Sequence, residues 1–122
     1  MRLVRIVNQT RGTTVGESVE LASTSLTRLW GLLGRRSVEA GGGLWITPSS
    51  GVHTMGMRFP IDVVGLDKDM RVIKVWHDLV PYRVTSVSMK MRSVIELAAG
   101  QIRERRIEVG DMLAVIQQPE SI

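Results

Sequence analysis

Two β-rich runs joined by a polar turn are the feature of this chain that most restricts how it can fold. The runs are "IDVVGL", residues 61–66, and "RVIKVW", residues 71–76, and the turn between them includes Asp67, Lys68 and Asp69. Branched and aromatic side chains favour strands, and aspartate favours tight turns. We therefore predict a β-hairpin over residues 61–76.

Further short runs of the same kind predict about seven strands in all. They lie near residues 3–7, 17–22, 43–46, 84–97 and 112–116, separated by segments rich in glycine, proline and polar residues. In the run 84–97, apolar and polar residues alternate, which predicts one buried and one solvent-facing side. The predicted buried side carries Val87, Met89, Met91, Ile95 and Leu97, and the predicted polar side carries Ser86, Ser88, Lys90, Arg92 and Glu96.

Helical patterns are few by comparison. A helix is predicted over residues 24–33, where Leu26, Leu29, Trp30 and Leu33 follow the spacing i, i+3, i+4, i+7. A short helix or turn is predicted over residues 101–106. Strands outnumber helices too heavily for alternating βαβ units. We expect an α+β, mostly β fold, with a compact antiparallel sheet that is barrel-like or sandwich-like.

Length and composition fit a single domain over residues 1–122. The chain has 43% hydrophobic and 23% charged residues, which lies in the ordinary globular range. It has no cysteine, which excludes disulfides, iron–sulfur clusters and thiol nucleophiles. His53 and His77 are its only histidines, and they are too isolated to indicate a metal site. We expect no metal and no cofactor.

The N-terminus "MRLVRIVNQT" has only short apolar runs, interrupted by Arg5 and Asn8. It therefore lacks the apolar core of a signal peptide, and no run in the chain approaches the length of a membrane span. We expect a cytoplasmic protein that makes no contact with a membrane.

The positive charge of the chain is concentrated in residues 83–106. The formal net charge is +4, and this segment alone holds six basic and two acidic residues, a difference of 6 − 2 = +4. Such clustering occurs in nucleic-acid-binding proteins, usually together with a groove-reading helix or exposed stacking aromatics. The chain has few aromatics, so a solvated basic face is the favoured interpretation. The basic residues are Arg83, Lys90, Arg92, Arg103, Arg105 and Arg106, and the acidic ones are Glu96 and Glu104.

The stretch "HTMGMRFPIDVVGLD", residues 53–67, is the best candidate for a ligand site. Counting by two from Thr54 reaches Arg58 and Asp62, so these polar residues share one side if Pro60 preserves the alternation. If the strand that contains Glu96 is a neighbour, two carboxylates and a guanidinium converge. Such a cluster can hold an anion or sugar hydroxyls, and it can equally be a buried ion pair. The candidate ligand-binding residues are His53, Thr54, Arg58, Asp62 and Glu96.

The motifs "GLLGR", "GLWI", "HTMGMRFPIDVVGLD", "VIELAAG" and "EVGD", in this order, resemble the domain of unknown function 192 (DUF192) family over about residues 20–116. The resemblance implies a compact, mostly β domain with two short helices and no established reaction, substrate or cofactor. Family members commonly have a Trp-Met-Lys-Asn-Thr run where this chain has "GMRFP", residues 56–60. Arg58 therefore takes the family's basic position, Asp62 its acidic position, and Glu96 the glutamate of the "VIEL" block.

Together these observations favour a non-catalytic binding module for a small polar or anionic ligand or for a protein partner. A small hydrolase that uses Asp62 and Glu96 as paired carboxylates is the alternative, since such pairs can divide acid and base roles. Nucleic-acid binding through residues 83–106 is less favoured. A serine nucleophile has no support, because the chain contains no Gly-x-Ser-x-Gly motif.

Overall fold

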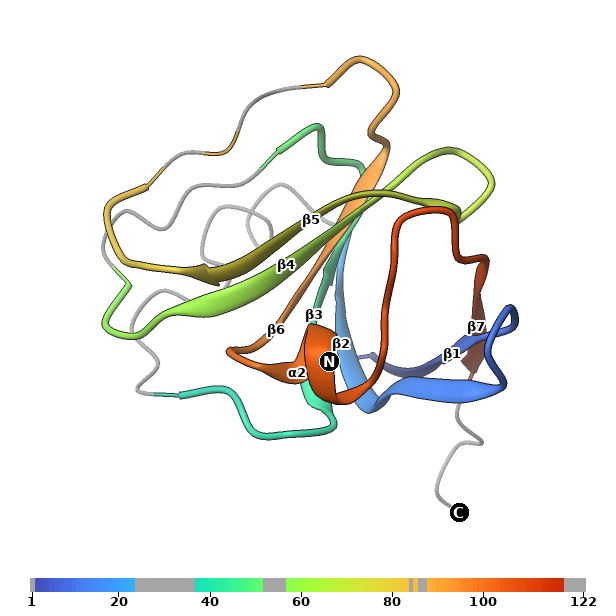
Figure 1. The fold of residues 1–122 in the computed structure, drawn as a ribbon, viewed down its shortest axis with the longest axis horizontal. Coiled ribbons are helices and arrows are strands. Elements are labelled where there is room, and N and C mark those ends of the chain that lie inside the picture. The colour runs from blue at the N-terminus through green and yellow to red at the C-terminus, as the bar shows by residue number, and fades with distance from the viewer. Residues whose placement is uncertain (1, 24–36, 52–56, 84, 86–87, 118–122) are drawn as a thin grey trace.

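The structure is a computed structural model that describes residues 2–23, 37–51, 57–83, 85 and 88–117. Within these residues it has seven strands and one short helix (Figure 1). The predicted number of strands and the short helix near residues 101–106 are confirmed, whereas the predicted helix over residues 24–33 lies outside the described residues. The elements are β1 Leu3–Asn8, β2 Thr13–Ala22, β3 Gly42–Ile46, β4 Ile61–Leu66, β5 Val72–Leu79, β6 Ser93–Ala98, α2 Gln101–Glu104 and β7 Leu113–Gln117.

All seven strands belong to one sheet with the order β5-β4-β6-β3-β2-β1-β7. The predicted hairpin is confirmed, because β4 and β5 pair antiparallel with Val64 opposite Val75. The sheet is mixed rather than antiparallel throughout, since β2 and β3 pair parallel. The residues between Ala22 and Gly42 are numerous enough for the crossover that a parallel pair requires. The sequence prediction did not anticipate this pair.

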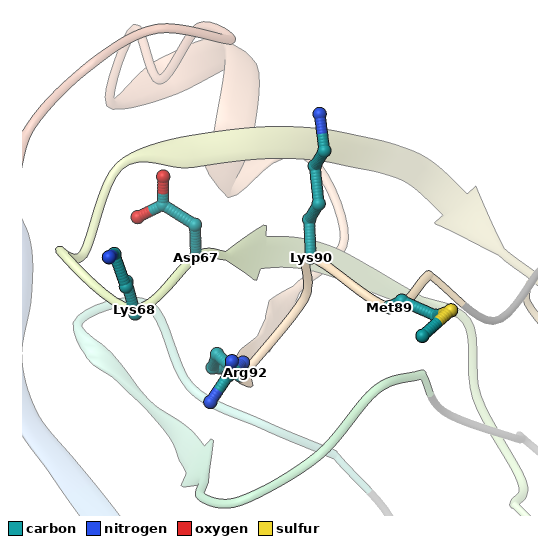
Figure 2. Close-up of a pocket in the computed structure, with 5 residues that line it drawn as sticks. All are labelled: Asp67, Lys68, Met89, Lys90 and Arg92. Carbon is teal, nitrogen blue, oxygen red and sulfur yellow. The ribbon is translucent and has the colours of Figure 1, made fainter.

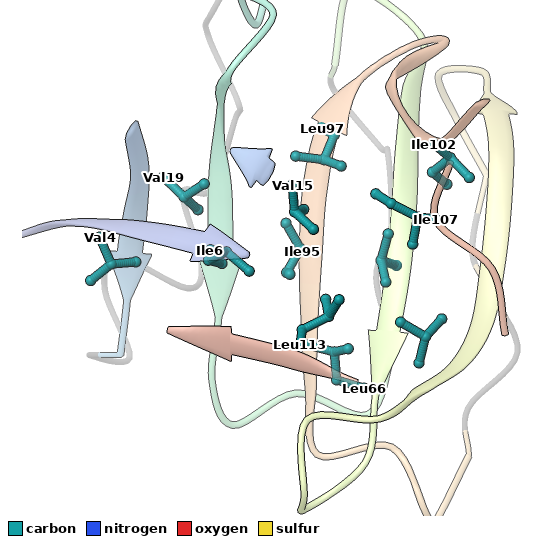
Figure 3. Packing of buried hydrophobic residues seen from close by; sticks show 12 residues of the cluster. Val4, Ile6, Val15, Val19, Leu66, Ile95, Leu97, Ile102, Ile107 and Leu113 are labelled. Carbon is teal, nitrogen blue, oxygen red and sulfur yellow. The ribbon is translucent and has the colours of Figure 1, made fainter. Parts of the chain in front are cut away.

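The two edges of the sheet meet at one end and curl it into a half-barrel. Arg71, just before β5, forms an isolated bridge with Met112, just before β7. The Val72 amide donates to the Asp111 carbonyl at 2.8 Å, and the Leu113 amide donates to the Met70 carbonyl at 3.0 Å. Buried side chains fill the inside of this curl (Figure 3). They form the first core cluster: Val4, Ile6, Val15, Val19, Val64, Leu66, Val72, Ile95, Leu97, Ile102, Ile107 and Leu113.

The opposite face of the sheet is also apolar and buried. This second core cluster accounts for the burial of every residue of β4 and of every residue of β6 except Ala98, since both strands are covered on both faces. The prediction of a polar face on the strand that holds Glu96 is therefore wrong, because Glu96 is only 4% exposed. The second cluster consists of Ala22, Leu44, Ile46, Met57, Ile61, Val63, Met91 and Val94.

The predicted strand 84–97 is also shorter than expected, since β6 begins at Ser93. A turn closed by the Met91 amide and the Ser88 carbonyl, 3.1 Å apart, interrupts the extended chain. This turn leaves Met89 95% exposed, although alternation had predicted it in the core. Met91 is buried in the second cluster and Ile95 in the first, so these two residues do not share a face.

The short helix α2 packs at the open end of the curl, where Ile102 is buried in the first cluster (Figure 1). Arg105, which follows it, donates to the Glu17 carboxylate at 2.8 Å and to the Thr14 carbonyl at 3.2 Å. These bonds attach α2 to β2. Of the helical residues described, none belongs to a helix long and apolar enough to cross a membrane.

Candidate functional site

Asp62 lies in the middle of the predicted ligand site, and the structure gives it partners from the backbone. Its side chain is completely buried on β4. Oδ1 accepts a hydrogen bond from the Asp78 amide at 2.9 Å, and Oδ2 accepts one from the Ile102 amide at 2.9 Å. Both carboxylate oxygens thus tie neighbouring elements, β5 and α2, to β4. This arrangement is a structural support for the fold.

Glu96 and Asp62 lie on adjacent strands but point to opposite faces of the sheet. In the pairing of β4 with β6, Asp62 is opposite Leu97 and Val63 is opposite Glu96. Residues directly opposite each other on paired strands point to the same face, and successive residues along a strand point to alternate faces. Glu96 is opposite Val63 and not Asp62, so its side chain and that of Asp62 lie on different faces. The inference that they converge is therefore wrong. One bound substrate cannot lie between them, and the geometry gives the hydrolase alternative no support.

Arg58 precedes β4 and is exposed, unlike the two buried carboxylates. His53 and Thr54 lie outside the described residues. The structure therefore does not assemble the predicted cluster from the candidates that it describes. A ligand contact by any one of these residues stays a prediction.

A different group of polar side chains gathers where two tight turns lie side by side. The first turn connects β4 to β5, and the Met70 amide closes it by donating to the Asp67 carbonyl at 3.2 Å. The second is the turn at residues 88–91, which leads into β6. The Arg92 amide donates to the Leu66 carbonyl at 2.8 Å, and this bond holds the two turns together.

A shallow pocket of about 320 Å³ lies between these turns (Figure 2). Its described lining consists of Asp67, Lys68, Met89, Lys90 and Arg92. The backbone of Arg92 is fixed on two sides, since its carbonyl also accepts from the Ser49 amide at 2.8 Å. The lysine side chains are exposed and project from turns whose backbones are hydrogen-bonded. We call this pocket the basic pocket.

The charge of the basic pocket is positive. Its described lining has three cations and one carboxylate, a local balance of 3 − 1 = +2. Asp67 uses Oδ1 within its own turn, where it accepts from the amides of Asp69 and Arg71, both at 2.9 Å. Within the described ranges, no carboxylate forms an ion pair with Lys68, Lys90 or Arg92. The cations are therefore available to an anion from solution.

A second pocket of about 280 Å³ adjoins the first, and Arg92 lines both. Its other described lining residues are Pro48, Ser49, Ser50 and Met91. We call it the neutral pocket, because Arg92 is the only charged residue among those described in its wall. Together the two pockets offer charge at one end and a mostly uncharged surface at the other.

Sequence reasoning recognised Lys68 only as a turn residue and Lys90 only as part of a basic face. That face, predicted over residues 83–106, is divided in the structure. Lys90 and Arg92 precede β6, whereas the arginines at residues 103–106 follow it, and six strand residues span about 20 Å. Within the second group, Arg105 is paired with Glu17. The sequence carries a signal for only one of the two turns, the predicted turn that includes Lys68, because residues 88–91 lie inside the run that was predicted as a strand.

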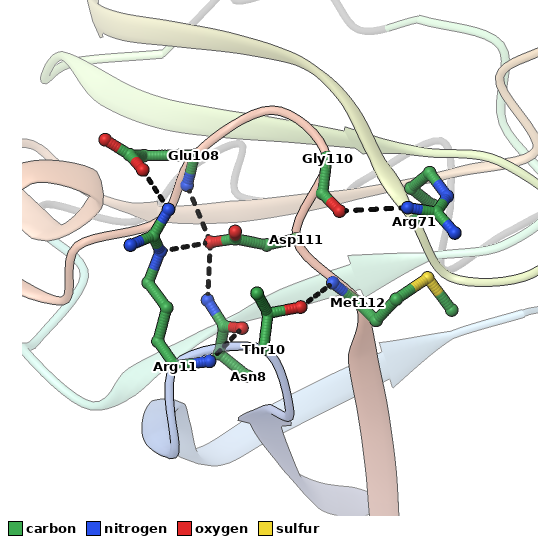
Figure 4. A network of polar contacts seen from close by, with 8 residues as sticks. All are labelled: Asn8, Thr10, Arg11, Arg71, Glu108, Gly110, Asp111 and Met112. Carbon is green, nitrogen blue, oxygen red and sulfur yellow. Dashed lines mark hydrogen bonds and ion pairs between the residues drawn. The ribbon is translucent and has the colours of Figure 1, made fainter.

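A second polar network joins the β1–β2 turn to the segment before β7 (Figure 4). The buried Asp111 carboxylate accepts at Oδ2 from Asn8 Nδ2 at 2.8 Å, from Arg11 Nε at 2.8 Å and from the Glu108 amide at 2.9 Å. Burial alone would raise the pKa of Asp111, but these hydrogen bonds and the charge of Arg11 outweigh it and lower the pKa below its ordinary value. Arg11 also pairs with Glu108. The network's polar groups bond to one another, so we interpret it as a structural latch.

Across the residues that the structure describes, no three His, Cys, Asp or Glu side chains are grouped in a way that could hold a metal ion. The fold and its pockets define this protein as a small, mostly β domain with a curled mixed sheet and a basic surface pocket. The sequence profile of the DUF192 family, described as "Uncharacterized ACR", matches residues 6–115. The chain therefore belongs to the DUF192 family, as its motifs had predicted.

Individual relatives agree with this assignment. The UPF0127 protein TK1120 of Thermococcus kodakarensis is 28% identical over 114 residues, which cover 89% of this chain and 71% of the relative. A crystal structure of a protein of unknown function from Novosphingobium aromaticivorans has a TM-score of 0.78 at 22% identity, covering 92% of this chain and 83% of its own. A crystal structure of a "putative transcription regulator" from Sinorhizobium meliloti has a TM-score of 0.79 at 24% identity, covering 93% and 92%. At these identities the two structures support the fold alone.

Proposed function

We propose that this protein is a non-catalytic binding module that recognises a small anionic ligand in the basic pocket. The observation that carries the proposal is the set of three cations, Lys68, Lys90 and Arg92, around a pocket of about 320 Å³ with no ion-pair partner in the described part of the chain. A cation without an ion-pair partner in the protein can form new hydrogen bonds to an anion from solution without breaking existing ones. Such charge-assisted hydrogen bonds are stronger than hydrogen bonds between neutral groups. The pocket volume lies at the lower end of the range for small-molecule sites.

The backbone around the pocket supports this proposal. Hydrogen bonds close both turns, and the Arg92 backbone is bonded through its amide and its carbonyl. A ligand would therefore have to order side chains but little backbone, which reduces the entropy cost of binding. This preorganisation favours ligand binding over an accidental gathering of surface charge.

Nucleic-acid binding through the basic residues of segment 83–106 is a second candidate, and the Sinorhizobium relative is called a "putative transcription regulator". The division of the basic residues by β6 argues against it, because a phosphate backbone is best followed by a continuous row of cations. A protein partner with an acidic segment would use the same cations, but a pocket of about 320 Å³ suits a small anion better.

The proposal is tested by titrating the ¹⁵N-labelled protein with inorganic phosphate at low ionic strength and following amide chemical shifts. We expect saturable shifts at residues 67–69 and 88–92. Lys90→Gln should weaken binding by about two- to fivefold, the amount that an exposed charge pair contributes. Arg103→Gln, which removes an exposed cation beyond the other end of β6, is the matched control and should have no effect. Shifts that do not saturate, or equal effects of both variants, would overturn the proposal.

A further inference from the structure

The basic and neutral pockets share one residue, Arg92, so a single ligand can occupy both. We infer that the ligand is a phosphate monoester whose dianionic group occupies the basic pocket and whose uncharged tail occupies the neutral pocket. This inference rests on the proposed function and adds to it the identity of the anionic group and the place of the remainder of the ligand.

The charge balance favours a dianion. The described residues of the basic pocket are three cations and one carboxylate, with a summed charge of +2, and a phosphate monoester carries about −1.5 to −2 at neutral pH. A monocarboxylate would neutralise only half of this charge. Arginine and lysine also complement each other for phosphate, since the planar guanidinium can bind two oxygens and the ammonium groups act as mobile point charges.

Arg92 determines where the ester oxygen would lie. It is the residue common to both pockets, and its backbone is fixed by Leu66 on one side and Ser49 on the other. If two unesterified oxygens of the phosphate bind the guanidinium and the third faces the lysines, the ester substituent is left to point across Arg92. That substituent leads into the neutral pocket.

The neutral pocket selects the character of the tail. Pro48 gives it exposed apolar surface, Met91 lies buried behind its wall, and several polar groups of the wall are already bonded. The Ser49 hydroxyl donates to the Gly51 carbonyl at 2.6 Å, and the Ser50 carbonyl accepts from the Ser88 amide at 3.3 Å. A charged tail would find no opposite charge among the described lining residues. An uncharged tail that is largely apolar fits this surface, and a hollow of about 280 Å³ has room for a tail of a few carbon atoms.

The experiment compares four probes by calorimetry and amide chemical shifts: inorganic phosphate, n-butyl phosphate, butyrate and 1-butanol. A fully buried methylene is worth about a fourfold gain in affinity, so a butyl tail that an open pocket covers by half should give about a tenfold gain. We expect n-butyl phosphate to bind about tenfold more tightly than inorganic phosphate. Butyrate should bind more weakly than inorganic phosphate, and 1-butanol should not bind measurably.

Two variants separate the pockets. Ser50→Phe places an aromatic side chain in the neutral pocket and should remove the tenfold advantage while the affinity for inorganic phosphate stays unchanged. Ser37→Phe adds the same side chain at an exposed position before β3, whereas Ser50 follows β3, and it should leave both affinities unchanged. Thermal unfolding of each variant establishes that it is folded.

The outcomes distinguish the inference from the proposal beneath it. Equal affinities for the two phosphates, or an advantage that survives Ser50→Phe, would overturn the assignment of the tail and leave anion binding intact. Butyrate binding as tightly as n-butyl phosphate would overturn the choice of a dianion. Failure of every anion to bind would overturn the proposed function, and the inference with it.

Discussion

Replacing Asp62 with alanine is expected to destabilise the protein strongly, although sequence reasoning selected this residue for ligand binding. The change removes the acceptor of two backbone amides, those of Ile102 and Asp78. The Ile102 hydrogen bond is buried, so its amide would lose its partner without gaining water, at a cost of about 1–3 kcal/mol. The Asp78 hydrogen bond is partly buried, and water can replace part of it, so about 1 kcal/mol is added. The expected loss in the free energy of unfolding is therefore about 2–4 kcal/mol.

Urea unfolding followed by tryptophan fluorescence measures this loss. Trp45 packs against the first core cluster and Trp76 against the second, so the signal reports on both faces of the sheet. Asp62→Asn keeps one acceptor oxygen and should lose about half as much stability. The control is Asp69→Ala, an exposed aspartate of the neighbouring turn, which should change the stability by less than about 0.5 kcal/mol. If Asp62→Ala matched this control, the structural role of Asp62 would be refuted and its ligand role would regain support.

Three further predictions concern the latch, the close approach of β3 to β6 and the attachment of α2. Because the folded-state pKa of Asp111 is lowered, its contribution to stability is present above the ordinary value of 3.8 and is lost as the pH falls through the folded-state pKa. Asp111→Asn should therefore be less stable than wild type at pH 7 and lose less stability on acidification, which urea midpoints at several pH values would show. Gly43→Ala would place a Cβ atom 2.5 Å from the Glu96 carbonyl oxygen, so we expect the free energy of unfolding to fall by about 1–3 kcal/mol. Thermal or urea unfolding measures this loss, and an unchanged stability would contradict the close approach of β3 to β6. Arg105→Lys keeps the charge near the half-exposed Glu17 but cannot reproduce together the bonds to the Thr14 carbonyl and to Gln101 Oε1. We therefore expect hydrogen exchange of the α2 amides to increase in Arg105→Lys by as much as in Arg105→Ala, and unchanged exchange in both variants would contradict this role of Arg105.

The parts of the fold that sequence predicted are those that depend on neighbours along the chain. The β4–β5 hairpin is one example, because its strands and its turn lie within residues 61–79. The parallel pairing of β2 with β3 was not predictable in the same way, since local pattern does not specify which edge a strand joins after a long crossover. Alternation along β6 failed as a guide because both of its faces are buried, so polarity no longer marks the outside.

The candidate site failed for a related reason. The sequence analysis considered Asp62 and Glu96 on neighbouring strands, and the strands are neighbours in the structure. Whether the two side chains converge depends on the register of the pairing, which the sequence does not specify. In the observed register an offset of one residue puts them on opposite faces of the sheet. The basic pocket was missed because Lys68 and Lys90 are far apart along the chain. The hydrogen bond between the Arg92 amide and the Leu66 carbonyl, which brings their turns together, involves only backbone atoms and leaves no mark on the sequence.

The same backbone bonding predicts that the proposed anion binding and the stability of the fold are separable. The side chains of Lys68, Lys90 and Arg92 are not used to close either turn, since the bonds that do so belong to the backbone and to Asp67. Removing one of these cations should therefore lower anion affinity and leave the free energy of unfolding nearly unchanged. Asp62→Ala should have the opposite pattern, because its lost bonds lie away from the basic pocket, in β5 and α2. A binding site whose charges are held by an independent framework can change its ligand preference without loss of the fold.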